Sequence, residues 1–368
     1  MRILLCGGGT AGHVMPAIAI AEIIEKHFPT ATIAFAGRVG GKENDAYMKT
    51  KHRLYTIDIS GISRSLSINN IKSIFKAIKS SRKAYDIISN FNPDIIIGTG
   101  GYVCYPFIRQ GQRMKIKTVI HESNVAPGLV TRLLGIRCDK LLLNLEGTKE
   151  NLKRVKNTIV VGNPMRDRFD MITKRDAKES LHIGKDQKLI ISFGGSLGAQ
   201  MLNETVLDLI SRYTLNNKNI YHIHATGRAH YEKAKEKYPE LFEKHRNIKI
   251  LPYIEDMPLF LRAADIAITR SGAMTVSELS KCATPSILIP SPNVTANHQY
   301  LNAEYMQKIG AALLIEEKDL SVEKLRNEIF SLMSKPEEIH RMSVCAAKAQ
   351  QYDTELLIVN VIKELQNR

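Results

Sequence analysis

Two stretches of the chain, LLCGGGTAGHVMPAIAIAEII at residues 4–24 and IISFGGSLGAQMLNETVLDLI at residues 190–210, follow the same plan. Each has a short apolar run, then a glycine-rich turn, then a segment with helical periodicity. Three glycines of the first stretch recur 186 residues later in the second, as Gly8, Gly9 and Gly12 become Gly194, Gly195 and Gly198. A strand that enters a helix through glycines is typical of a doubly wound sheet. The repetition therefore predicts two domains of the same kind.

Strand-like runs alternate with helical patterns along the rest of the chain. The predicted strands are RILLC, TIAFA, DIIIG, KTVIH, KLLLN and TIVVG in the first half, then KLIISF, YHIHA, IKILP, DIAIT and PSILIP. This alternation predicts an α/β fold of two Rossmann-like, doubly wound parallel-sheet domains. Because such sheets bind ligands beyond the carboxyl ends of their strands, we expect the two domains to face each other across a ligand-binding cleft.

The domain boundary is predicted from the segment GNPMRDRF at residues 162–169, which combines glycine, proline and charge after the last strand of the first half. We expect an N-terminal domain at residues 1–163 and a C-terminal domain at residues 164–345. Residues 346–368 are expected to form a C-terminal helix that packs back toward the N-terminal domain.

The composition of the 368 residues is that of a globular protein, with 44% hydrophobic and 24% charged residues. The five scattered cysteines include no C-x-x-C pair, which argues against a zinc site and for a reducing compartment. Glycines interrupt the uncharged stretch at residues 3–21, and prolines interrupt the one at residues 282–303, so neither predicts a membrane span. Only four apolar residues precede the first glycines, too few for a secretory leader.

Positive charge is concentrated in the first half. The net charge is +15, and residues 1–163 carry +13 of it. Such a bias predicts a phosphate-bearing substrate, an anionic membrane surface or nucleic acid as partner. The chain has no tryptophan, only 6% aromatic residues and no recognised nucleic-acid-reading motif, so we predict that it binds no nucleic acid.

The glycine loops predict phosphate binding, because backbone N–H groups can approach an anion where side chains are missing. Gly7, Gly9 and Gly12 satisfy G-x-G-x-x-G, but the second strand ends in Gly37 and Arg38 rather than the carboxylate that holds an adenosine ribose. An NADP-dependent oxidoreductase that uses Arg38 is therefore an alternative. However, further clusters, GTGGY at 98–102 and GGS at 194–196, exceed what one dinucleotide needs.

The segment RSGAMTVSE at residues 270–278 can be interpreted in two ways. Thr275 and Glu278 fit the capping box T-x-x-E, in which the glutamate only caps a helix. Alternatively, Glu278 accepts two hydrogen bonds from a ribose while the loop holds phosphate. Downstream, NHQYLNA at residues 297–303 places polar side chains at the start of another helix, which suits the recognition of sugar hydroxyls.

Seven motifs resemble, in order and spacing over about residues 1–315, the MurG family of peptidoglycan N-acetylglucosaminyltransferases. They are GGGTAGHVMPAIAIA, GTGGYV, HESNVAPGL, VGNPMRD, GGSLGAQ, TRSGAMTVSELS and NVTANHQYLNA. The resemblance implies the GT-B fold, with UDP-N-acetylglucosamine bound by the C-terminal domain and undecaprenyl-diphosphate-linked MurNAc-pentapeptide bound by the N-terminal domain. The implied reaction is inverting transfer of N-acetylglucosamine to the muramoyl 4-hydroxyl, which converts lipid I to lipid II.

The resemblance also assigns roles to residues. It implies that the Ile254 backbone reads uracil, that Glu278 holds the ribose and that Gln299 contacts the sugar. The residues implied around the diphosphate are Arg166, Ser196, Ala273, Met274, Thr275, Val276 and Ser277. Those implied on the acceptor side are Thr10, Ala11, Gly12, His13 and Asn124. The chain departs from the family pattern at Leu197, Gln200, His298 and Cys104-Tyr105, which bear on substrate fit.

The expected reaction needs a base for the acceptor hydroxyl and positive partners for the departing diphosphate. His13 lies beside the first glycine loop, and imidazoles titrate near neutral pH, so His13 is the predicted base and Glu122 its rival. The chain has no Asp-x-Asp pair, with Glu43-Asn-Asp45 and Asp353-Thr-Glu355 as the nearest imitations, so we predict no metal and no other cofactor. Helix N-termini, Ser196 and Arg166 are expected to stabilise the leaving group, each donor by about 3 kcal/mol.

Residues 64–83 predict a basic amphipathic helix. Its apolar positions are Ile71, Ile74, Phe75 and Ile78, and its basic face includes Lys72, Lys76 and Lys79. Such a helix can pack on its own domain, but an acceptor anchored in lipid favours contact with an anionic membrane surface. The resemblance implies a peripheral place on the cytoplasmic face of the bacterial inner membrane, with other cell-wall synthesis proteins as partners. Other GT-B lipid glycosyltransferases and sugar-nucleotide epimerases remain the nearest rivals.

Overall fold

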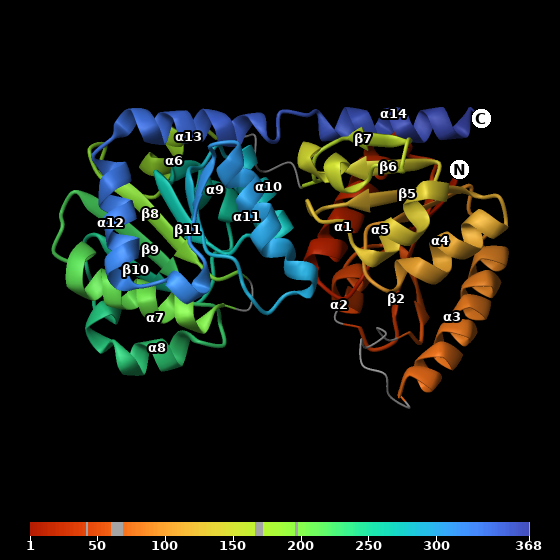
Figure 1. Cartoon of the computed structure of the whole chain (residues 1–368), viewed down its shortest axis with the longest axis horizontal. Coiled ribbons are helices and arrows are strands. Elements are labelled where there is room, and N and C mark those ends of the chain that lie inside the picture. Colours follow the sequence, from red (N-terminus) through yellow and green to blue (C-terminus); the bar gives the residue numbers. More distant parts are fainter. Residues whose placement is uncertain (42, 60–68, 166–171, 196–197, 368) are drawn as a thin grey trace. The chain divides into compact units, whose positions relative to one another are not determined.

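The chain forms two compact units in a computed structural model that describes residues 1–41, 43–59, 69–165, 172–195 and 198–367 (Figure 1). The side chains of Ala11, Thr295 and residues 69–79 also lie outside the described part. The N-terminal unit comprises residues 1–166 and 352–368, and the C-terminal unit comprises residues 167–351. Among the described residues, no helix combines the length and the apolar character needed to span a bilayer.

The N-terminal unit is built on a seven-stranded parallel sheet, sheet A, with strand order β3-β2-β1-β4-β5-β6-β7. Its strands are β1 Arg2–Cys6, β2 Thr32–Arg38, β3 Arg53–Ile57, β4 Ile95–Gly98, β5 Lys117–Glu122, β6 Lys140–Leu143 and β7 Thr158–Val160. The order changes direction between β1 and β4, so ligands are expected beyond the carboxyl ends of these two strands.

Both faces of sheet A are covered by helices. They are α1 Ala11–His27, α2 Glu43–Met48, α3 Asn69–Phe91, α4 Cys104–Arg113, α5 Leu129–Leu134 and α14 Thr354–Gln366, with short 3₁₀ helices η1 Gly135–Arg137 and η2 Glu146–Asn151. Ile3 and Leu5 of β1 pack with α1 and α14, whereas Leu4 and Cys6 pack with α3 and α4. Apolar residues fill both faces because each strand of a parallel sheet is buried on both sides.

The last helix belongs to the N-terminal unit although it ends the chain. Ile358, Val359 and Ile362 of α14 are buried in the same core as α1 (Figure 1). The preceding helix, α13 Pro336–Lys348, belongs to the C-terminal unit, and the chain returns to the N-terminal unit at Tyr352.

The C-terminal unit repeats this plan with a six-stranded parallel sheet, sheet B, in the order β10-β9-β8-β11-β12-β13. Its strands are β8 Lys188–Phe193, β9 Ile220–Ala225, β10 Ile248–Leu251, β11 Ile266–Thr269, β12 Ser286–Leu288 and β13 Ala312–Leu314. Its other helices are α6 Lys174–Ser180, α7 Gln200–Leu209 with the π-helical turn η4 Ile210–Thr214, α8 Tyr231–Lys237, η5 Pro239–Phe242, α9 Met257–Ala263, α10 Ala273–Lys281, η6 Thr295–Asn297, α11 His298–Lys308, η7 Glu317–Asp319 and α12 Val322–Met333.

The two sheets confirm the predicted α/β fold of two Rossmann-like parallel-sheet domains. Every strand predicted from the sequence is present, but β3 and β13 were missed. Both are edge strands. An edge strand is buried on fewer sides, and the sequence of β3, RLYTI, lacks the continuous apolar run that identifies a central strand.

A chain of buried polar side chains lies inside the C-terminal unit. Ser192 Oγ of β8 is 2.9 Å from His222 Nε2 and 2.9 Å from His224 Nδ1 of β9, and Thr214 Oγ1 is 3.4 Å from His222 Nδ1. Both histidines are fully buried. Burial lowers the pKa of His222 well below its ordinary value and that of His224 to about 4, because the charged imidazolium loses its hydration.

The buried histidines predict loss of stability in acid. Unfolded histidines take up protons near pH 6.5 while the folded ones stay neutral, so stability is retained above about pH 6.5 and falls toward pH 4. His224→Gln should lessen the loss between pH 6 and 4.5 by about 1.4 kcal/mol per pH unit. Urea unfolding of both proteins at several pH values measures this difference, and equal slopes would contradict it.

Candidate functional site

The glycine loops that follow β1 and β4, at residues 7–12 and 98–102, pack against each other at the carboxyl edge of sheet A. Gly8 N donates to Gly100 O at 3.3 Å, and Thr99 Oγ1 donates to the carbonyl of His13 at 2.6 Å. Gly101 has φ +82°, and a Cβ atom there would collide with the carbonyl oxygen of Gly8. The loops after β1 and β4 therefore pack backbone against backbone, which only glycine allows at this position.

His13, in the first turn of α1, is held by this loop pair. Its Nδ1 is 3.0 Å from the carbonyl oxygen of Gly8 and 3.2 Å from Thr10 Oγ1. Because a carbonyl only accepts, the contact with Gly8 favours the tautomer with the proton on Nδ1 and the lone pair on Nε2. Gly100 also lies against the ring, since a Cβ atom there would be 2.8 Å from Nε2.

Glu43 stabilises the glycine loop that follows β1. Its side chain is buried, and its carboxylate accepts hydrogen bonds from Arg38 N at 3.0 Å and Gly9 N at 3.4 Å. The sequence singled out Glu43 only as an imitation of a metal-binding pair. Its observed contacts instead join the end of β2 to the first glycine loop.

Glu122, at the end of β5, is tied to the loop that follows it. Its Oε1 accepts from Asn124 N at 3.1 Å and Asn124 Nδ2 at 3.4 Å. Its Oε2 accepts from Gly128 N at 2.8 Å and Thr131 Oγ1 at 2.7 Å. Four donors occupy the two oxygens, so Glu122 fixes the position of Asn124 and the start of α5.

The motifs HESN and VGNP, which are far apart in sequence, also meet at this edge. Ser123 Oγ donates to Asn163 Oδ1 at 3.2 Å, and His121 Nε2 lies 3.1 Å from the carbonyl oxygen of Gly162. Burial lowers the pKa of His121, so the imidazole is neutral and donates from Nε2. Two sets of contacts thus link the loops at the carboxyl edge of sheet A: one joins the segments after β1, β2 and β4, and the other joins the ends of β5 and β7.

The C-terminal unit has an equivalent turn between β8 and α7. Gly195 and Gly198 have φ +82° and +77°, and a Cβ atom on Gly198 would collide with the carbonyl oxygen of Thr226. The predicted diphosphate contacts Ser196 and Arg166, and the family departure Leu197, lie outside the described residues.

Glu278 is not part of a capping box. Helix α10 begins at Ala273 with Gly272 as its N-cap, which places Thr275 inside the first turn and Glu278 a full turn beyond the helix start. Neither a hydrogen bond nor an ion pair to its carboxylate is found within the described part of the chain. Desolvation raises its pKa to about 7. A desolvated carboxylate without a partner is ready to accept donors from a ligand.

The segment around Gln299 is connected to the loop before α10. Ser271 Oγ donates to the carbonyl of Gln299 at 2.7 Å, and Asn302 Nδ2 donates to the carbonyl of Ser271 at 3.1 Å. Gln299 Oε1 accepts from Ser291 N at 2.9 Å. The predicted diphosphate loop and the predicted sugar-contacting helix are therefore brought together within one unit.

Arg270, which the sequence did not single out, organises this region. Its Nη1 donates to the carbonyls of Ile289 and Pro290 at 3.1 and 3.2 Å, and its Nη2 pairs with Glu317. Beside it lies a pocket of about 290 Å³ lined by Met201, Pro290, Ser291, Pro292, Asn297, Tyr300, Glu316, Glu317 and Lys318. No local pattern identifies Arg270, because its partners lie 19 to 47 residues away.

Three helices that follow glycine-containing loops begin without a capping hydrogen bond from the side chain of the N-cap residue. No side chain caps α1 at Thr10, α7 at Ala199 or α10 at Gly272. By contrast, Thr173, Asp256, Ser321 and Asp353 cap α6, α9, α12 and α14. Uncapped N–H donors with the positive end of the helix dipole favour anions at the glycine loops.

Comparison with known proteins identifies both units. Residues 3–143 match the glycosyltransferase family 28 N-terminal domain, and residues 189–357 match the glycosyltransferase family 28 C-terminal domain. The chain belongs to glycosyltransferase family 28. Family membership agrees with the resemblance inferred from the seven motifs, and it favours a glycosyltransferase over an oxidoreductase or a nucleic-acid-binding protein.

Relatives in this family match over their full length. A protein of Alkaliphilus metalliredigens named "UDP-N-acetylglucosamine--N-acetylmuramyl-(pentapeptide) pyrophosphoryl-undecaprenol N-acetylglucosamine transferase" is 37% identical, with 100% of each chain covered. A protein of the same name from Acetivibrio thermocellus is 38% identical, covering 99% of this chain and 98% of its own. The crystal structure of Acinetobacter baumannii MurG is 25% identical, with a TM-score of 0.79 and 99% of each chain covered.

The structure also bears on the other residues that the sequence predicted to contact substrate or membrane. Ile254 follows β10 with its side chain buried, which leaves its backbone as the group that can contact a ligand. Thr10 is exposed beside His13, whereas the side chain of Ala11 is not described. Helix α3 begins at Asn69, but the side chains of the predicted membrane face, Ile71, Lys72, Ile74, Phe75, Lys76, Ile78 and Lys79, lie outside the described part.

The contact between the glycine loops predicts that alanine substitutions at Gly9 and at Gly101 have different effects on stability. Gly9 and Gly101 both have positive φ, but a Cβ atom on Gly9 meets nothing within 4 Å. Gly9→Ala should therefore cost about 1–2 kcal/mol of unfolding free energy from backbone strain alone. Gly101→Ala should cost at least twice as much and abolish activity. Urea unfolding followed by circular dichroism measures both, and equal losses would contradict the loop contact.

Proposed function

We propose that this chain transfers N-acetylglucosamine from UDP-N-acetylglucosamine to the 4-hydroxyl of undecaprenyl-diphospho-MurNAc-pentapeptide, the lipid I to lipid II step of peptidoglycan synthesis. The observation that carries the proposal is the desolvated carboxylate of Glu278, which has no hydrogen-bond or ion-pair partner among the described residues and lies about one turn from the uncapped start of α10. The names of full-length relatives support the same reaction.

The donor is bound by the C-terminal unit in this proposal. Glu278 accepts hydrogen bonds from the ribose hydroxyls, and the backbone of Ile254 reads the uracil. The first turn of α10, from Ala273 to Ser277, faces the diphosphate together with Ser196 and Arg166. Gln299, which is held by Ser291 and Ser271, contacts the sugar.

The acceptor is bound at the carboxyl edge of sheet A, where Thr10, Ala11, Gly12 and Asn124 surround the muramoyl group. His13 is the proposed base, because the hydrogen bond from Nδ1 to Gly8 directs the lone pair of Nε2 to the proton. Glu122 positions Asn124 rather than taking the proton, since both of its oxygens already accept hydrogen bonds.

The proposed reaction is a single displacement. The 4-hydroxyl loses its proton to His13 Nε2 while its oxygen forms a bond to the anomeric carbon. The bond from that carbon to the β-phosphate oxygen breaks on the opposite face, so the configuration inverts and UDP leaves with the electron pair. Uncapped N–H groups of α10 and α7 stabilise the developing charge. We propose that no divalent metal takes part, since the sequence lacks an Asp-x-Asp pair.

Two rivals share the fold and differ in their products. A glycosyltransferase specific for another lipid would release UDP when that lipid is supplied as the acceptor. It would not release UDP when undecaprenyl-diphospho-MurNAc-pentapeptide is supplied. A sugar-nucleotide epimerase would convert UDP-N-acetylglucosamine without any acceptor. Assays of UDP release with a panel of lipid acceptors, and of the donor alone, separate these possibilities.

The proposed place of the protein is peripheral, on the cytoplasmic face of the membrane, because the acceptor is lipid-anchored. Support comes from the sequence of α3, whose basic and apolar positions form neighbouring faces. Other cell-wall synthesis proteins are proposed partners at this surface.

His13→Ala is expected to lower kcat about a hundredfold or more, because general-base catalysis contributes that much, while KM for the donor stays nearly unchanged. His52→Ala is a matched control, since His52 pairs with Glu25 elsewhere on the N-terminal unit. Steady-state kinetics of UDP release measures both. Near-normal turnover of the His13 variant would remove this residue from the mechanism.

Glu278 predicts pH-dependent donor binding. The carboxyl has a pKa of about 7 in the free protein, and only the ionised form accepts both ribose hydroxyls without first losing a proton. Affinity for UDP-N-acetylglucosamine should therefore rise about tenfold per pH unit up to about pH 7 and then level off. Glu278→Gln should bind more weakly and lose this dependence. Calorimetric titration between pH 5.5 and 8.5 tests it, and an unchanged pH profile in the variant would contradict the assignment.

A further inference from the structure

The loop that follows β12 in the C-terminal unit is held by side chains rather than by secondary structure. Ile289 N continues the pattern of the sheet with a bond to the carbonyl of Thr269 at 2.8 Å. Beyond it, Pro290 and Pro292 have no N–H group to donate, and with Ser291 they line a cavity of about 290 Å³. The remaining polar groups of this loop therefore need side-chain partners.

Arg270 is the partner of two of these groups. Its Nη1 donates to the carbonyl of Ile289 at 3.1 Å and to that of Pro290 at 3.2 Å, while its Nη2 pairs with Glu317. The side chains of Arg270 and Glu317 are only 11% and 17% exposed. Because a guanidinium group is planar, the pair with Glu317 also fixes the direction of Nη1. Glu317 thus orients Arg270, and Arg270 holds the loop.

The next donor along the loop fixes the amide of Gln299. Ser291 N donates to Gln299 Oε1 at 2.9 Å. A backbone N–H group can only donate, so the oxygen of the amide, and not its nitrogen, must face Ser291. Among the described residues, none accepts a hydrogen bond from Gln299 Nε2. Gln299 is therefore left with N–H donors to offer a ligand.

The main chain of Gln299 is anchored separately from its side chain. Ser271 Oγ donates to the carbonyl of Gln299 at 2.7 Å, and Asn302 Nδ2 donates to the carbonyl of Ser271 at 3.1 Å. Ser271 and Asn302 are both fully buried. Because these bonds do not involve the Arg270 side chain, a change of that side chain should redirect the Gln299 amide and leave the start of α11 in place.

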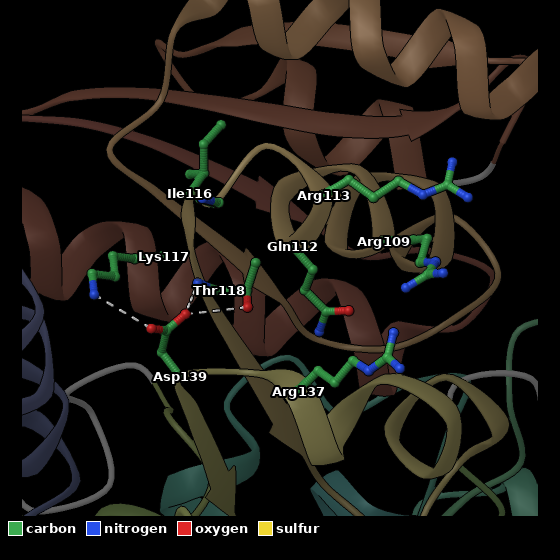
Figure 2. A pocket seen from close by; sticks show the side chains of 9 residues that line it. Arg109, Gln112, Arg113, Ile116, Lys117, Thr118, Arg137 and Asp139 are labelled. Atoms are coloured by element: carbon green, nitrogen blue, oxygen red, sulfur yellow. Dashed lines mark hydrogen bonds and ion pairs between the residues drawn. The ribbon is translucent and has the colours of Figure 1, made fainter.

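Gln112, on α4 of the N-terminal unit, shows the contrasting arrangement (Figure 2). Its Nε2 donates to the carbonyl of Leu134 at 3.0 Å, and its Oε1 is buried. Neither end of this amide is open to a ligand. The Gln112 amide is therefore structural, whereas one end of the Gln299 amide remains for a ligand.

We infer that Arg270 and Glu317 are positioning residues for the donor sugar. They hold the loop after β12 so that Ser291 directs the Nε2 donors of Gln299 toward an oxygen of N-acetylglucosamine. This inference rests on the proposed function, from which it takes the contact between Gln299 and the sugar. Since the pair acts only through Gln299, its loss should weaken binding of the sugar and spare binding of UDP.

Calorimetric titration of the full chain with UDP-N-acetylglucosamine and with UDP separates these two effects. Arg270→Met should bind UDP-N-acetylglucosamine about fivefold more weakly, as expected for one lost hydrogen bond, with less than about a twofold change for UDP. Gln299→Met should show the same selective loss. The double variant R270M/Q299M should bind no more weakly than Gln299→Met alone, because both changes remove the same contact.

Two matched controls separate positioning from loss of charge or of packing. Arg262 of α9 is also partly buried and donates to a backbone carbonyl, that of Lys281 at 3.2 Å. Arg262→Met therefore removes the same charge from the same unit and should change neither affinity. Gln112→Met removes an amide that no ligand can reach and should also change neither.

Glu317→Gln is the milder variant, since it keeps an acceptor for Arg270 Nη2 and removes only the charge. It should bind UDP-N-acetylglucosamine about twofold more weakly and spare UDP, because a hydrogen bond to a neutral acceptor is weaker. Circular dichroism of each variant verifies that it is folded. If Arg270→Met fails to fold, Glu317→Gln and its double variant with Gln299→Met provide the same comparison.

Equal losses for UDP and UDP-N-acetylglucosamine, additive losses in the double variants, or the same selective loss in Arg262→Met would overturn the inference. Unchanged binding of UDP-N-acetylglucosamine by Arg270→Met would also overturn it while leaving the proposed function intact. By contrast, an unaltered chain that does not bind UDP-N-acetylglucosamine would contradict the proposed function, and this inference with it.

Discussion

The N-termini of α1, α7 and α10, each reached through glycine and each without a side-chain cap, are the constraint on which the rest of this structure depends. Their N–H groups lack side-chain acceptors at Thr10, Ala199 and Gly272. A folded protein leaves such donors unsatisfied only where water or a ligand completes them. Glycine makes these positions accessible, and at Gly101 it also allows one loop to rest directly on the backbone of another. The phosphate chemistry of the proposed reaction follows from this arrangement.

Buried carboxylates next to the glycine loops fix the backbone conformation of these loops through hydrogen bonds. Glu43 and Glu122 are both buried carboxylates whose hydrogen bonds go mainly to backbone N–H groups, one below the first glycine loop and one below the loop that carries Asn124. Glu278 differs because it is desolvated and has no such partner in the described part of the C-terminal unit. Glu43 and Glu122 thus stabilise loops of the N-terminal unit, whereas Glu278 of the C-terminal unit is left to accept hydrogen bonds from a ligand.

The central strands and glycine turns were predictable from the sequence because burial on two faces demands continuous apolar runs. The edge strands β3 and β13 were missed, because β3 mixes polar and apolar residues and is only partly buried, and β13 has only three residues. The capping-box alternative for Glu278 failed because the helix starts two residues earlier than Thr275, at Ala273, a shift that the motif alone cannot detect. The sequence did not single out Arg270, and it noted Glu43 only as part of an imitation of a metal-binding pair, because their partners Ile289 and Gly9 are 19 and 34 residues away. The predicted membrane side chains of α3, together with Ser196 and Arg166, lie outside the described residues.

The central claim is that this chain forms a new glycosidic bond with inversion at the anomeric carbon. The most direct test incubates the purified full chain with UDP-N-acetylglucosamine and undecaprenyl-diphospho-MurNAc-pentapeptide and determines the product linkage by proton nuclear magnetic resonance. The account predicts stoichiometric UDP and a β-linked disaccharide joined at the muramoyl 4-oxygen. An α-linked product, or conversion of the donor to another UDP-sugar with the acceptor untouched, would contradict it.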